Sequence, residues 1–285
     1  MAGETGGRLF TGRWLLLLLP ALLFNIIFFL YPLIFVASRS FAGFSVDNYV
    51  LIFTTPVYIR VILLTFKTSC IVTVACLLLA YPYAYAMTRA GPWGLAALSI
   101  ALLLPFWVSL LLRSFAWMIL LQDTGLINRM LLSSGLITQP LSLIRNTFGV
   151  GLGMTHILLP YVVLPLYAVM RKIEPRLMEA ASISGATPMR QFFRVFFPLS
   201  LPGVYAGALL AFTLGLGFYI TPALLGGARD TMIGQLIAGQ ISEQLNFGMG
   251  SALGVVLLVL TALAFALFGL VLMIGRRSVD GRVPA

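Results

Sequence analysis

The chain has 285 residues, of which 60% are hydrophobic and only 9% charged, and its mean hydropathy is +1.04. This composition excludes an ordinary soluble enzyme and predicts an integral membrane protein. A net charge of +10 would suggest nucleic-acid binding in a soluble protein. Here the basic residues lie mostly at the ends of apolar runs, where they act as topology signals.

Six apolar runs are long enough to cross the hydrocarbon core, which requires about 20 residues in a helix. They predict an all-α protein with a single transmembrane domain over 1–285 and spans at about 14–36, 61–87, 93–121, 150–170, 201–222 and 252–274. The first run is longer than the core of a signal peptide and lacks a clean small-x-small cleavage site, so we interpret it as a retained span. Both termini then lie on one side of the membrane.

The distribution of basic residues predicts that this side is the cytoplasm. With the termini inside, eleven basic residues face the cytoplasm: Arg8, Arg13, Arg89, Arg171, Lys172, Arg176, Arg190, Arg194, Arg276, Arg277 and Arg282. The other seven fall outside or within outer span ends: Arg39, Arg60, Lys67, Arg113, Arg129, Arg145 and Arg229.

The second span contains two cysteines and two tyrosines of interest. We interpret Cys70 and Cys76 as buried small residues, neither a disulfide nor a metal pair. Tyr81 and Tyr85 lie one helix turn apart, so they share a face. They either line a path for a cation or belong to an interfacial tyrosine belt, to which the nearby Arg89 also points.

The third and fourth spans carry two ionisable side chains, Arg113 and His156. A charged residue at the bilayer centre costs roughly 2.5–3.5 kcal/mol on insertion scales, so Arg113 must face the helix bundle or reach the outer interface. A structural role and a gating role both remain open for it. His156 has no Cys, Asp or Glu near it in the sequence, and we interpret it as a buried hydrogen-bonding residue, with gating as the alternative.

The segment 173–200 is a long polar interruption between the fourth and fifth spans. Pro175 suits the first position of a short helix, and Gly185 breaks that helix. Thr187 and Pro188 then restart the chain as an N-cap hydroxyl followed by a proline at the first helical position. The pattern predicts two short helices around a glycine elbow.

This second short helix is expected to end at Pro198 and Pro202, where the fifth span starts. Its apolar bulk beside a polar first helix predicts a knob that docks on another protein. The alternative is an interfacial loop that lies on lipid headgroups.

Glu179-Ala180-Ala181, three residues, Gly185 and then Val195-Phe196-Phe197-Pro198 resemble the EAA loop of permease subunits of ABC importers. The family pattern is E-A-A, three residues, G, nine residues and I-x-L-P, and the two departures remain apolar. The resemblance implies a type I importer permease fold whose loop sits in a cleft of the ATP-hydrolysing subunit and transmits its closure. We expect the ATPase-coupling residues to be Arg176, Glu179, Ala180, Ala181, Gly185 and Pro188.

The fifth span is the best candidate for the lining of a pathway. Gly203 and Gly207 form a Gly-x-x-x-Gly face, and further glycines interrupt the helix toward the outside. Plain helix packing is the alternative role of these glycines. The candidate substrate-path residues are Trp117, Asp123, Tyr161, Phe218, Tyr219, Thr221 and Glu243. Of these, Asp123 also fits a turn, and Glu243 also fits a contact with a binding protein.

Three stretches, 113–117, 158–167 and 218–227, are similar to the first permease subunit of spermidine/putrescine importers, and the similarity extends over about 47–274. It implies a bacterial inner-membrane location, a second homologous permease subunit in a heterodimer, two copies of an ATP-binding subunit and a periplasmic substrate-binding protein. It also implies polyamine transport. Other small amines, opines or aminophosphonates are the alternative substrates.

The sequence contains no G-x-x-x-x-G-K-[ST] phosphate loop and no cluster of metal ligands or nucleophile with base. We therefore expect no catalytic residue, no bound metal or cofactor and no nucleic-acid partner in this chain, with ATP and Mg²⁺ held by the ATPase subunit. A gradient-driven transporter or channel is the alternative from another class, but it would normally carry acids or histidines inside its spans.

Overall fold

The computed structural model describes residues 13–41 and 45–280. Every regular element in these ranges is helical, which confirms the all-α class. The chain divides into two compact units, which we describe separately: 1–54 with 237–259, and 55–236 with 260–285. Arg8 and Arg282, which we counted toward the orientation, lie outside the described residues.

Six helices in the described residues are long and apolar enough to cross a membrane, as the sequence predicted. They are Leu18–Ser40, Pro56–Arg89, Leu110–Ser133, Thr147–Met170, Pro188–Leu216 and Phe247–Gly269. A shorter apolar helical stretch, Pro92–Trp107, precedes the third of them.

The first unit contains α1 (Arg13–Asn25), the π-helical turn η1 (Ile26–Leu30), α2 (Tyr31–Ser40) and α3 (Asp47–Thr54). It also takes in the end of α13 (Ile233–Ser242) and the start of α14 (Phe247–Asp280). Ser40 Oγ and the Tyr49 hydroxyl form a 2.6 Å hydrogen bond that joins α2 to α3. At the other end of the unit, Gly250 lies so close to Ile241 that a Cβ there would meet its Cγ1 at 2.5 Å. The glycine therefore lets α14 approach α13 within this unit.

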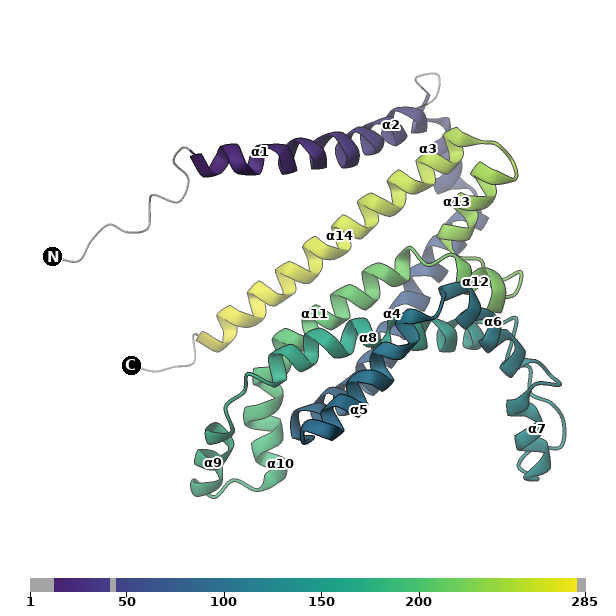
Figure 1. The fold of residues 1–285 in the computed structure, drawn as a ribbon. Coiled ribbons are helices and arrows are strands. Elements are labelled where there is room, and N and C mark those ends of the chain that lie inside the picture. The colour runs from purple at the N-terminus through teal and green to yellow at the C-terminus, as the bar shows by residue number, and fades with distance from the viewer. Residues whose placement is uncertain (1–12, 42–44, 281–285) are drawn as a thin grey trace. The chain divides into compact units, whose positions relative to one another are not determined.

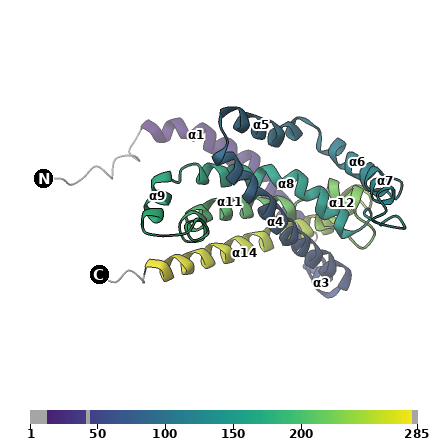
Figure 2. The ribbon, with the colours of Figure 1, turned by 90° about the horizontal axis from the view of Figure 1, so that it is seen from below.

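The second unit is built on α4 (Pro56–Arg89), α8 (Thr147–Met170) and α11 (Phe197–Leu216), which lie side by side (Figures 1 and 2). Small residues on α11 allow this close approach. A Cβ on Gly207 would meet Val162 Cγ1 at 2.8 Å, and one on Gly203 would meet the Leu166 Cα at 3.0 Å. The predicted Gly-x-x-x-Gly face thus packs against α8.

The cysteines of α4 differ from each other in burial. Cys76 is fully buried in the core, as expected, but Cys70 is exposed, so that prediction was wrong for Cys70. Six positions correspond to about 600° of helix rotation, so the two side chains cannot share one face. Cys70 therefore points away from the core that encloses Cys76.

The third apolar run differs from the single span expected at 93–121. It consists of α5 (Pro92–Leu103), a 3₁₀ turn η3 (Leu104–Trp107) and α6 (Leu110–Leu121), followed by α7 (Leu126–Ser133). Pro105 has no N–H to continue the helix, and Val108 is extended with φ −93° and ψ 131°. The run is therefore divided into two helical pieces.

The fifth span also differs from its expected start. Helix α10 (Pro188–Gln191) continues through a π-helical turn, η4 (Phe192–Phe196), into α11 without ending at Pro198 or Pro202. In the π-helical turn the Phe197 N–H bonds to the Phe192 carbonyl, five residues earlier. The π-helical turn changes the hydrogen-bond register just before Pro198, which has no N–H to donate. The helix therefore continues past Pro198, from the polar segment into the membrane span.

Candidate functional site

The polar segment folds as two short helices joined at Gly185, and we call α9 (Pro175–Ile183), the elbow and α10 together the coupling loop. Gly185 has φ +80°, a left-handed conformation that glycine adopts without strain. The Gly185 N–H bonds to the Ser182 carbonyl at 2.9 Å and the Ala186 N–H to the Ala181 carbonyl at 3.0 Å. These two bonds form a Schellman motif, which ends α9 at the elbow.

The second helix of the coupling loop begins as the sequence predicted. The Thr187 hydroxyl accepts from the Arg190 N–H at 3.4 Å, and Pro188 occupies the first turn of α10. The Gln191 side-chain amide donates to the Ala186 carbonyl at 2.8 Å and closes the elbow from the other side. The elbow is thus held in one shape by its own hydrogen bonds.

The surface of the coupling loop is open. Neither α9 nor α10 contains a buried residue. Large apolar side chains are exposed on this surface: Ile183 is 89% exposed and Met189 is 71% exposed. Of the six expected coupling residues, five are exposed and Ala181 is half-buried. The structure places all six on this one two-helix element.

Aromatic side chains join the coupling loop to the core. Tyr85 lies edge-on to Phe192 and Phe196 of η4, with ring centroids 5.9 and 5.2 Å apart. Tyr81 contacts Phe192 at 5.9 Å, and its hydroxyl bonds to Ser200 Oγ at 2.9 Å. From the sequence we predicted either a cation path or an interfacial belt for these tyrosines, and did not predict their contact with η4. Their shared helix face did indicate that both could contact the same neighbouring element.

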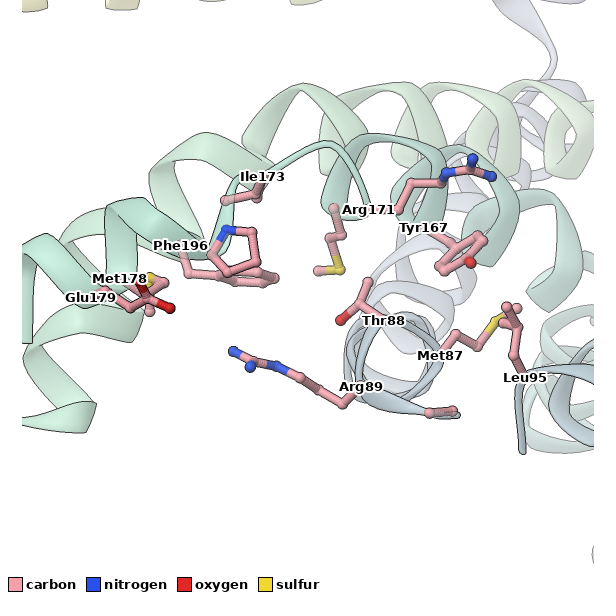
Figure 3. Close-up of a pocket in the computed structure, with 13 residues that line it drawn as sticks. Met87, Thr88, Arg89, Leu95, Tyr167, Arg171, Ile173, Met178, Glu179 and Phe196 are labelled. Atoms are coloured by element: carbon pink, nitrogen blue, oxygen red, sulfur yellow. The ribbon is translucent and has the colours of Figure 1, made fainter. Parts of the chain in front are cut away.

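A cleft of about 360 Å³ lies between the coupling loop and the ends of α4 and α8 (Figure 3). Its lining is apolar over much of its surface, with Met87, Leu95, Met170, Ile173, Met178 and Phe196. Arg89, Arg171 and Glu179 bring charge to it. The two arginines each lie over a tyrosine ring of their own helix, Arg89 5.3 Å from Tyr85 and Arg171 5.9 Å from Tyr167.

A second group of candidate residues surrounds the break that follows α11. The helix ends at Leu216, and the chain resumes as α12 (Ile220–Leu225). Phe218 and Tyr219 lie in the break, where Phe218 is half-buried and Tyr219 is 47% exposed. Thr221 is buried and shares a 3.1 Å hydrogen bond with Ser114 of α6. In membrane proteins a discontinuous helix is expected where the backbone faces protein or a water-filled cavity.

Polar contacts also join α6 to α8. Trp117 Nε1 donates to His156 Nδ1 at 3.1 Å, so His156 is a half-buried hydrogen-bonding residue. The Nε atom of Arg113 is buried without a hydrogen-bond partner. Tyr161 packs against Phe106 with centroids 5.2 Å apart. Trp117, Thr221 and their partners therefore lie on helices that contact one another.

The two acidic candidates are both exposed, and no side-chain hydrogen bond joins either of them to these described residues. Asp123 is exposed in the turn before α7, where the Gly125 N–H bonds to the Gln122 carbonyl at 2.8 Å. Glu243 is exposed just after α13 and belongs to the first unit. Within the described ranges, no group of three or more His, Cys, Asp or Glu could hold a metal ion.

The family model described as "binding-protein-dependent transport system inner membrane component" matches residues 14–283. This match covers nearly the whole chain. The chain belongs to this family. It is therefore a multi-pass inner-membrane permease and a translocation subunit rather than an enzyme.

Curated relatives of this permease agree with the assignment. The spermidine/putrescine transport system permease protein PotB of Haemophilus influenzae is 35% identical, over 77% of this chain and 76% of its own. The inner membrane ABC transporter permease protein YdcU of Escherichia coli is 32% identical, over 90% of this chain and 88% of its own. The molybdenum transport system permease protein ModB of Mycobacterium bovis is 31% identical, over 76% and 78%.

A solved structure supports the type I importer permease fold. A chain of a bacterial alginate ABC transporter, in complex with an alginate pentasaccharide-bound periplasmic protein, superposes with a TM-score of 0.71 at 22% identity. The superposition covers 88% of the permease and 92% of that chain. The resemblance drawn from the coupling-loop residues is thus confirmed at the level of family and fold.

Proposed function

We propose that this permease imports polyamines, spermidine or putrescine, which a periplasmic binding protein delivers. The observation that carries the ATP-driven part is the coupling loop, whose exposed Ile183 and Met189 offer an apolar surface to a partner. The loop continues through η4, whose Phe196 packs against Tyr85, directly into α11. The substrate assignment draws support from the PotB relatives.

The partners follow from this proposal. Two copies of an ATP-binding subunit hold ATP and Mg²⁺ and receive the coupling loops of this permease and of a second, homologous permease. Closure of the ATPase moves α9 and the Gly185 elbow, and η4 passes the movement to α11. Both termini face the cytoplasm in this arrangement, in agreement with the distribution of basic residues.

We place the substrate path beside the break between α11 and α12. Phe218 and Tyr219 offer aromatic rings there, and ring faces attract cations. Thr221 lies in α12 and bonds to Ser114 of α6. Trp117 of α6 bonds to His156 of α8, and Tyr161 of α8 packs against Phe106. Asp123 and Glu243 would act only at the outer entrance.

One observation favours the second candidate, import of another small amine, an opine or an aminophosphonate. The Nε–H of Arg113 is buried and has no acceptor. A substrate that carries a carboxylate or phosphonate could supply one, whereas a polyamine would be repelled by the guanidinium. The two candidates share the same permease architecture and differ only in substrate.

Uptake of labelled putrescine and spermidine into vesicles, with the complete transporter and binding protein, tests the proposal. We expect uptake that requires ATP and the ATPase subunit. ATP-dependent uptake of a labelled opine or aminophosphonate, together with no polyamine uptake, would favour the second candidate. Uptake by the permease without any ATPase would contradict the ATP-driven proposal and favour a gradient-driven transporter.

A further inference from the structure

The cleft beneath the coupling loop brings together two opposite charges that are far apart in the sequence. Arg89 is the last residue of α4, and Glu179 lies in the middle of α9. Both line the cleft, and Figure 3 shows the Arg89 side chain extending from the end of α4 toward the side where Glu179 lies. The structure shows no ion pair between these two described residues.

Arg89 is held in a position that suits such a pairing. Its guanidinium lies over the Tyr85 ring at 5.3 Å, and Tyr85 itself is packed edge-on against Phe192 and Phe196. Arg89 is thus connected to η4 through Tyr85, which contacts both. The lining of the same cleft also includes Met87, Met178 and Phe196, which are apolar and, in the case of methionine, adaptable in shape.

We infer that Arg89 is a positioning residue of the coupling machinery, which forms an ion pair with Glu179 when the cleft closes during the transport cycle. This inference rests on the proposed coupling role of the loop. An ion pair on an open surface contributes little, but closure of the cleft removes water and strengthens the attraction. The pair would hold α9 to the end of α4 in one state of the cycle and release it in the other.

A double-mutant cycle in the complete transporter tests the pairing. We expect Arg89→Gln to lower ATP-driven uptake about three- to tenfold, the range of a partly buried charge pair, and Arg89→Lys to restore part of it. In a Glu179→Gln background, Arg89→Gln should cause no further loss. The matched control is Lys172→Gln, which removes a positive charge from the turn after α8 but does not line the cleft.

Cross-linking gives a readout that does not depend on activity. Arg89→Cys and Glu179→Cys, in a background without Cys70 and Cys76, are joined by a short thiol reagent in the presence and absence of a non-hydrolysable ATP analogue. We expect the yield to change severalfold with nucleotide. An unchanged yield, or losses from the two Gln substitutions that multiply, would overturn the inference. Failure of wild-type uptake to depend on ATP would instead contradict the proposed function.

Discussion

The three-helix core and the coupling loop of the second unit differ in how closely their residues are packed. In the core, glycines bring α11 so close to α8 that an added Cβ would meet a neighbour at 2.8 Å. In the coupling loop, neither helix has a buried residue, and a Cβ on Gly185 would meet nothing within 4 Å. Glycine thus serves close packing in the core and backbone shape in the loop. The exposed surface of the loop is the one that the proposed contact with the ATPase would use.

Of the substitutions that test this difference between core and loop, we expect the largest loss of stability from one in the core. Gly207→Val would force α11 away from α8, because Val162 side-chain and backbone atoms lie within 3.3 Å of the new Cβ. Overpacking of this kind typically costs about 1–3 kcal/mol. We expect a lower melting temperature in detergent and less protein in the membrane.

The matched control for Gly207 is Gly151 on α8, where an added Cβ would meet nothing within 4 Å. Gly151→Ala should leave the melting temperature unchanged or raise it slightly, because alanine favours the helix. Equal melting of the Gly207→Val protein and the wild type would contradict the close packing described for α11.

A smaller effect is expected where α6 meets α12. Thr221→Val removes the hydrogen bond to Ser114, but Ser114 keeps its own bond to the Leu110 carbonyl at 3.0 Å. Side-chain hydrogen bonds between membrane helices contribute about 0.6 kcal/mol on average. The expected result is a slight loss of thermal stability. Thr213→Val is the control, since the Thr213 hydroxyl donates to the Leu209 carbonyl of its own helix. A loss of stability in Thr213→Val as large as that in Thr221→Val would show that the link to α6 contributes nothing.

Local signals made the six spans and the coupling loop predictable. Apolar runs of membrane length need no tertiary information, and Pro175, Gly185 and Thr187-Pro188 each determine their own backbone conformation. These signals gave the number of spans and the start of both short helices, as the structure has them.

The features that depend on distant partners were not predictable in the same way. The split after Pro105 and the π-helical turn before Pro198 depend on how each helix accommodates a missing N–H, which the same residue can do in several ways. The contact of Tyr85 with Phe196 and the cleft shared by Arg89 and Glu179 join residues far apart in the chain. Neither is encoded in a local pattern.

The most direct test of the central claim, that the coupling loop transmits ATPase closure to the core, compares two substitutions at Gly185 in the complete transporter. Valine is strained at φ +80°, whereas asparagine tolerates this conformation. Binding-protein-stimulated ATP hydrolysis and substrate uptake should both be lost in Gly185→Val and largely retained in Gly185→Asn, with equal amounts of both proteins in the membrane. Normal uptake by Gly185→Val would contradict the claim.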